Sequence, residues 1–185
     1  MHRYPRGFPM PASSTLMLEL RLAAHALDDA SLGLTAYRQS VARALQQRFQ
    51  CSVASLWVFQ GGEGQRRLRC VAAFSIDPHL SAEGTDLQET DFPVYFDTLR
   101  RTGVYSASEA QADPHLAGMK DSYLVPQNVH ALLDVAYQIN GQLTGVLCIE
   151  QRDTPRAWTR NDAMELRKAA SAIGISIARL QSSAS

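Results

Sequence analysis

The sequence predicts an α+β domain in which an antiparallel β-sheet is covered on both faces. A β-hairpin is indicated over residues 131–151, where two apolar runs flank Asn140-Gly141, because a type I′ turn needs positive φ at both central positions. Both faces of this hairpin are largely apolar, which is typical of a strand pair in the middle of a sheet. Apolar stripes with helical spacing also lie near both ends of the chain, which adds helices to the sheet.

The amino-terminal third is predicted to hold an arm, two helices and two strands. A proline-rich arm at residues 1–12 precedes an amphipathic helix within residues 13–33, and a second helix covers about residues 35–50. Strands are expected at about residues 53–59 and 68–74, with a glycine-rich loop between them. The stripe of the first helix repeats at spacings of four and three and comprises Leu16, Leu20, Ala23, Leu27 and Ala30.

The middle of the chain, about residues 76–129, loses the strand periodicity. Pro93 is suited to the first turn of a helix that Gly103 closes. A short strand over residues 104–106, a loop, and a helix over about residues 115–124 are predicted to follow. Asp113, just before Pro114, is expected to cap this helix. We expect this segment to consist mainly of helices and loops.

The hairpin turn fixes an expected strand register. With a two-residue loop, Ile139 lies opposite Gln142, so Val135 is predicted to lie opposite Val146. Asp134 interrupts the alternation of its strand. An ionised carboxylate is costly to bury alone, so Asp134 must find donors, water or a ligand.

The last helix is predicted to begin at a capping box and to form part of a dimer seam. Thr159 and Asp162 match the [ST]-x-x-[DE] pattern, and residues 182–185 form a short tail. The apolar stripe of this last helix comprises Leu166, Ala170, Ile173, Ile177 and Leu180. Three helices would compete for one face of the sheet: the first helix, the helix over residues 35–50 and the last helix. A single chain is less able to bury both terminal stripes there, so we predict a homodimer through the terminal helices.

Three segments together resemble a GAF domain. They are SVASLWVF at residues 52–59, FPVYFDTLRRTGVYSASEAQADPHLAGMKDSYLVPQNVHALLDV at 92–135, and INGQLTGVLCIEQRDTPRAWTRNDAMELRKAASAIGISIARL at 139–180. The resemblance is closest to GAF modules placed before histidine-kinase or GGDEF cyclase outputs in bacterial signalling proteins. It implies a domain over residues 34–181, a sheet of about six strands with the terminal helices on one face, and a roof over the other.

The resemblance also implies a small-molecule pocket between the roof and the central strands. Tyrosines with an apolar body and a polar tip are typical of such pockets, and a carboxylate can anchor a ligand. The alternatives are a core role for the aromatic residues and, for Asp134, a hydrogen bond to the roof backbone. The candidate ligand-binding residues are Tyr105, Tyr123, Asp134, Met119, Tyr95 and Trp57.

Composition and spacing argue against several other classes. Lys plus Arg and Asp plus Glu both number 18, which disfavours nucleic-acid binding. Apolar runs are too short to cross a bilayer and no secretory signal is evident, so a cytoplasmic location without membrane contact is expected. Cys51, Cys70 and Cys148 have the pattern of reduced structural thiols, and no metal-ligand spacing occurs among the histidines and cysteines. No cofactor or metal site is predicted.

Three functional classes compete. The leading one is a non-catalytic sensor that binds an unidentified small molecule and signals through its terminal helices to an output domain or partner. The second is a scaffold for dimerisation or protein interaction without a ligand. The third is an enzyme similar to the methionine sulfoxide reductases of the superfamily, whose cysteine pattern is not matched here. In the subset of the family that this chain resembles, the segment aligned with Cys148 to Gln151 commonly reads CHEH, and here Ile149 and Gln151 replace both histidines.

Overall fold

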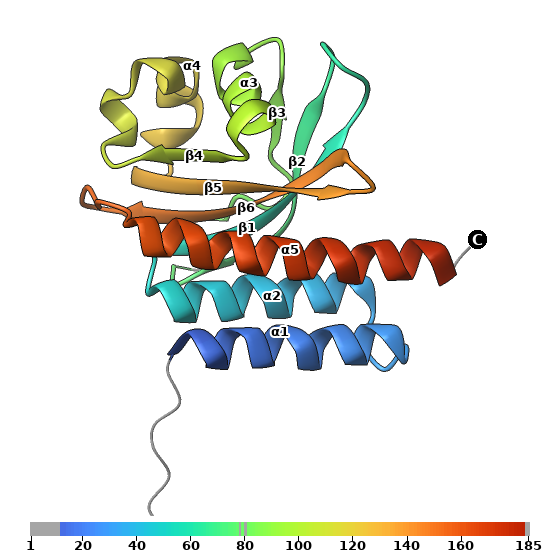
Figure 1. The fold of residues 1–185 in the computed structure, drawn as a ribbon. Helices are drawn as coiled ribbons and strands as arrows, with labels where there is room; N and C mark the ends of the chain where they lie inside the picture. Colours follow the sequence, from blue (N-terminus) through green and yellow to red (C-terminus); the bar gives the residue numbers. More distant parts are fainter. Residues whose placement is uncertain (1–11, 78, 80, 184–185) are drawn as a thin grey trace, which may run out of the picture.

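The computed structural model describes residues 12–77, 79 and 81–183. Within them, six strands form one antiparallel sheet in the order β3-β2-β1-β6-β5-β4 (Figure 1). This confirms the predicted fold class. The predicted arm, apart from Ala12, and the end of the predicted tail lie outside the described residues. The strands are β1 (Val53–Gln60), β2 (Arg67–Ser75), β3 (Asp86–Gln88), β4 (Val104–Ala107), β5 (Val129–Ile139) and β6 (Gln142–Arg152).

Three helices cover one face of the sheet in two layers. Helices α2 (Leu34–Phe49) and α5 (Arg160–Ser183) pack on the strands, and α1 (Ala12–Asp28) packs on α2 and α5 (Figure 1). Helix α5 starts at the predicted capping box: the Thr159 N–H donates to Asp162 Oδ2 at 2.8 Å, and the Asp162 N–H donates to Thr159 Oγ1 at 3.1 Å. These two bonds satisfy backbone donors that the first turn leaves free.

The other face carries a roof of short segments. It contains α3 (Pro93–Thr102), the 3₁₀ turns η1 (Ala110–Ala112) and η2 (Pro114–Leu116), the single turn α4 (Ala117–Met119) and the π-helical turn η3 (Lys120–Leu124). The continuous helix predicted over residues 115–124 is therefore wrong. The helix type changes twice along this segment, from 3₁₀ to α and from α to π, while Leu116, Met119 and Leu124 are all buried.

A β-bulge shifts the central hairpin away from the predicted register. Ile139 lies opposite Gln142 as predicted, but Val135 pairs with Leu147 instead of Val146. Gln138 pairs with Leu143 and Tyr137 with Gly145, so Thr144 is an extra residue on β6. One extra residue moves the following pairs by one position, as far as Ala131 with Gln151.

Tertiary packing explains the glycine in this bulge. A Cβ atom on Gly145 would overlap the carbonyl oxygen of Trp57 and the hydroxyl group of Tyr137. The Trp57 oxygen belongs to the neighbouring strand β1 and cannot move without disturbing the sheet. The tight contact therefore requires a residue without a side chain.

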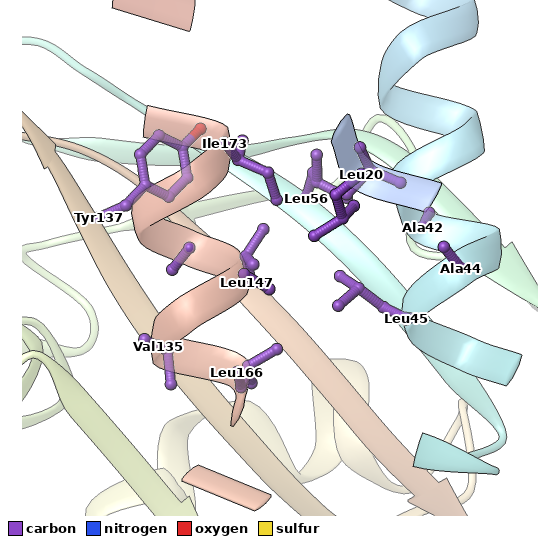
Figure 2. Close-up of a cluster of buried hydrophobic side chains, with 14 of the residues drawn as sticks. Leu20, Ala42, Ala44, Leu45, Leu56, Val135, Tyr137, Leu147, Leu166 and Ile173 are labelled. Atoms are coloured by element: carbon purple, nitrogen blue, oxygen red, sulfur yellow. The ribbon is translucent and has the colours of Figure 1, made fainter. Parts of the chain in front are cut away.

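The helix side of the sheet forms one apolar cluster between α1, α2, α5 and the strands. Figure 2 shows its centre, with Leu45 of α2 and Ile173 of α5 directed toward Leu56 and Leu147 of the sheet. Both predicted dimer stripes contribute to it within one chain: Leu16, Leu20 and Leu27 of α1 are buried, as are Leu166, Ala170, Ile173 and Ile177 of α5. The expectation that one chain is less able to bury both stripes is therefore wrong for these seven residues, because α1 forms an additional layer.

We predict that Gly145→Ala lowers the free energy of unfolding by about 2 kcal/mol, since the added methyl group overpacks a rigid backbone contact. Chemical denaturation measures this loss. Gly62→Ala is the control, because a Cβ atom there meets nothing within 4 Å. Equal unfolding midpoints for the two variants would contradict the proposed role of Gly145.

Candidate functional site

Two carboxylic acids lie on the roof side of the two central strands. Asp134 of β5 pairs with Cys148 of β6, and Glu150 follows two positions further along β6. All three side chains therefore face the roof. Asp134 is 2% exposed and Glu150 is 1% exposed, so both acids are inside the protein.

Tyrosine hydroxyl groups from the roof bind both acids. Tyr95 of α3 donates a hydrogen bond to Asp134 Oδ2 at 2.7 Å, and Tyr123 of η3 donates to Glu150 Oε1 at 2.8 Å. The thiol of Cys148 lies between the acids, with its Sγ 3.7 Å from Glu150 Oε1. The partner of Asp134 is thus a tyrosine, not the roof backbone that was the alternative expectation.

Each acid also keeps one oxygen without a partner. Asp134 Oδ1 and Glu150 Oε2 are buried and accept no hydrogen bond from the residues that the structure describes. A buried acceptor without a donor costs about 1–3 kcal/mol, and more if it is charged. The two oxygens therefore mark a place where the fold gives up stability.

Burial makes both acids weak. It raises the pKa of Asp134 to about 6, although hydrogen bonds from Cys148 and Tyr95 act in the opposite direction. It raises the pKa of Glu150 to about 7, against the hydrogen bond of Tyr123 and with the charge of Asp134 as an additional cause. The two acids therefore change their protonation state near neutral pH, between about pH 6 and about pH 7.

Tyr105 of β4 lies beside this pair but binds another acid. Its hydroxyl group donates to Asp113 Oδ2 at 3.0 Å, while Asp113 Oδ1 accepts the His115 N–H at 2.9 Å and caps η2 as predicted. The Tyr105 ring lies 5.2 Å from that of Tyr95. Tyr105 is therefore next to the Asp134 site without a hydrogen bond to it.

The remaining two predicted residues belong to the same buried cluster. Met119 and Trp57 pack in the roof-side core, and the Trp57 indole N–H donates to Ser55 Oγ at 2.8 Å. Trp57 faces the roof and not the terminal helices. Sequence reasoning missed Glu150 and Cys148. These two residues are two positions apart on β6 and therefore share one face of the sheet, which was the available signal. The predicted register placed Asp134 opposite Leu147, so Asp134 was not expected on that face.

The roof rests directly on the sheet. Leu99, Leu116 and Leu124 are completely buried between them, so the side chains of the chain itself fill the space predicted for a ligand. An open depression of about 440 Å³ lies elsewhere, between α1, α2 and the start of α5, and Arg48 and Arg156 contribute to its lining.

The structure gives no support for thiolate or metal chemistry among the described residues. The three cysteines are free and buried. Burial raises the pKa of Cys51 and Cys70 to about 12 and that of Cys148 well above its usual value. No group of three or more His, Cys, Asp or Glu side chains in the described part of the chain could hold a metal ion. None of its helices is long and apolar enough to span a membrane.

Comparisons with known proteins add a family and a fold. The family model described as "GAF domain" matches residues 34–177. No curated protein sequence matches the chain. The blue-light absorbing PixJ GAF domain of Thermosynechococcus elongatus has a similar structure, with 19% identity, a TM-score of 0.68, and coverage of 88% of this chain and 89% of that chain.

Two further structures are similar at the level of the fold. The phycoerythrobilin-bound GAF domain of a cyanobacterial phytochrome shows 14% identity, a TM-score of 0.74, and coverage of 96% and 100% of the two chains. The GAF domain of an Acinetobacter phosphoenolpyruvate-protein phosphotransferase shows 15% identity, a TM-score of 0.67, and coverage of 92% and 97%.

The buried acids predict how stability depends on pH. Their pKa values rise on folding, from 3.8 to about 6 for Asp134 and from 4.5 to about 7 for Glu150. The folded state therefore keeps protons that the unfolded state releases, and the free energy of unfolding should fall between pH 4 and 7. Each acid corresponds to about 3 kcal/mol. Denaturation series at different pH values measure this loss.

Isosteric amides separate the two contributions. Asp134→Asn should remove the part lost between pH 4 and 6, and Glu150→Gln the part lost between pH 4.5 and 7, because neither amide ionises. Asp97→Asn is the control, since Asp97 is an exposed acid whose pKa is lowered, first by its hydrogen bond from Arg100. Unchanged pH slopes in both amide variants would refute this assignment.

Proposed function

Because the chain belongs to the GAF-domain family, we propose that it is a non-catalytic sensory module that binds a small molecule between the sheet and its roof. The observation that carries this proposal is the pair of buried carboxyl groups that each keep one unpartnered oxygen. A ligand with hydrogen-bond donors would satisfy both oxygens and recover the stability that they cost. The phycoerythrobilin-bound GAF domain of similar fold is a precedent for small-molecule binding.

Ligand entry requires the roof to move away from the sheet. Its central part consists of one-turn segments, η1, η2, α4 and η3, and such segments open at a lower free energy than long helices. Tyr123 of η3 donates to Glu150 Oε1, so the carboxyl group that keeps Oε2 for a ligand also holds this part of the roof. Binding and roof position are thereby coupled.

The central strands give the site a connection to the terminal helices. Asp134 and Glu150 face the roof, whereas their neighbours Leu133 and Ile149 lie in the helix-side cluster with α5. A shift of β5 or β6 on ligand binding would change how α5 and, through it, α1 pack. We propose that this shift transmits the signal to an output domain or partner. Free cysteines suit a cytoplasmic setting.

A scaffold without a ligand is the second candidate, and the closed roof favours it. Leu99, Leu116 and Leu124 already fill the roof-side core, so the roof would then serve only to cover the sheet. A reductase is disfavoured, because an attacking thiolate is scarce when burial raises the thiol pKa to about 12 at Cys70. Covalent attachment of a bilin needs a cysteine in the roof. It is disfavoured as well, since no cysteine lies between residues 76 and 129.

Native mass spectrometry tests the sensor. Protein purified from its own cells should retain a small molecule, and Tyr123→Ala should weaken its binding by about 1–3 kcal/mol through the loss of one buried aromatic contact. Val125→Ala is the control in the same part of the roof, because the Val125 side chain is 48% exposed. Equal retention by both variants, or no retained molecule in the wild type, would favour the scaffold instead.

We further propose a homodimer through the outer surfaces of α1 and α5. The stripes first assigned to the seam are buried within the chain, but Leu18, Leu22 and Ile175 are 52%, 63% and 56% exposed. Because α1 is the outermost layer, a partner copy can cover these side chains without displacing the core.

Sedimentation at micromolar concentration tests the dimer. The wild type should sediment as a dimer, and Leu18→Glu with Leu22→Glu should give a folded monomer, because charge on an apolar interface must be desolvated. Ile76→Glu is the control, since Ile76 is 67% exposed and follows the end of β2. A double variant that remains dimeric would exclude this surface.

A further inference from the structure

We propose that the ligand of this site is a small, flat organic cation whose N–H groups bind Asp134 and Glu150 at the same time. The inference rests on the proposed function and specifies the chemical class of the ligand. Three features of the roof-side core carry it: the spacing of the two acids, the charge around them and the aromatic side chains beside them.

The spacing of the acids suits one bridging group. Asp134 is level with Cys148, and Glu150 is the next residue of β6 on the same face, so the two acids are diagonal neighbours on adjacent strands. Such neighbours have Cα atoms about 7–8 Å apart and Cβ atoms somewhat closer. Each acid keeps one buried oxygen without a donor, Oδ1 and Oε2, and an amidinium or guanidinium centre offers two N–H groups in one plane to two such acceptors.

The charge around the acids selects a cation. The groups that face or contact them include the hydroxyls of Tyr95 and Tyr123, the thiols of Cys70 and Cys148, and Ser55 of β1. Arg152 is the positive side chain on the same face of β6, and its guanidinium group donates to Ser75 and Gln127. The negative charge of the two acids, when both are ionised, therefore exceeds the positive charge of the one arginine. An anionic ligand would be repelled, whereas a cation balances the second charge.

Aromatic side chains select a flat molecule. The Tyr95 ring contacts the rings of Phe96 and Tyr105 with centroids 5.7 Å and 5.2 Å apart. Aromatic faces attract cations, and flat conjugated groups stack on them. A ligand that inserts here would place its charge at the acids and its apolar body among these rings.

The same geometry links binding to protons. When no cation is bound, burial keeps the acids partly protonated near neutral pH, with pKa values of about 6 for Asp134 and about 7 for Glu150. A bound cation favours the ionised form of both, so binding releases protons to solvent. Affinity should therefore rise with pH between 6 and 8 and level off above that range.

Three probes of nearly equal shape test the class: benzamidine, which is a cation, benzamide, which is neutral, and benzoate, which is an anion. Calorimetry on the purified full chain should show that benzamidine binds at least tenfold more tightly than either of the others. Its affinity should increase severalfold from pH 6 to pH 8. The double variant Asp134→Asn with Glu150→Gln should lose the preference, and Asp97→Asn, which alters an exposed acid, should keep it.

Several outcomes would overturn the inference. They are equal binding of benzamide or benzoate, a preference for benzamidine that survives in the double amide variant, and failure of benzamidine to bind at millimolar concentration. The proposed function can be judged separately. A neutral or anionic molecule retained in native mass spectrometry and lost in Tyr123→Ala leaves the sensor intact while the cationic class fails. Absence of any retained molecule, together with no probe binding, removes both.

Discussion

The hairpin of β5 and β6 must be covered on both faces, and the rest of the structure depends on this constraint. Its two strands are 11 residues each and carry apolar side chains on both sides. Leu133 and Leu147 need the helical layer, whereas Leu132 and Val146 need the roof. A sheet with one face in water cannot accommodate such strands. The helices and the roof each cover one face of the hairpin, and both of its strands contribute side chains to both apolar clusters.

The roof-side cluster differs from the helix-side cluster in that it contains acids. An apolar residue at position 134 or 150 would fold at lower cost, since burying a carboxyl group requires either a donor for each oxygen or a bound proton. The tyrosines supply only one donor to each acid. A fold that keeps such groups accepts a local loss of stability, and sites with this property are commonly functional. The helix-side cluster, by contrast, supplies the apolar burial that allows the loss.

Local sequence signals predicted much of this structure. The Asn140-Gly141 turn, the capping box at Thr159 and the capping role of Asp113 are encoded by adjacent residues, and each is confirmed. The bulge at Thr144 could not be predicted in this way, because it depends on how Gly145 packs against Trp57 and Tyr137. Without this extra residue, the predicted register paired Asp134 with Leu147 instead of Cys148. Glu150 was then expected on the opposite face of the sheet from Asp134 and was not recognised as part of the site. Strand β3 and the broken roof helix were missed for a related reason: both are too short to show a period of their own.

The lengths of the strands also bear on aggregation. The two edges of the sheet are formed by β3 and β4, which are three and four residues long, whereas the long apolar strands occupy the middle. Short edge strands offer few free backbone groups to a second molecule and thereby limit edge-to-edge association. The hairpin pairs strands that are adjacent in the sequence, however, whereas β1 and β4 come from more distant segments and must close longer loops to join it. Until then, two long apolar strands have open edges, so the newly made chain is most prone to aggregate before its sheet is complete.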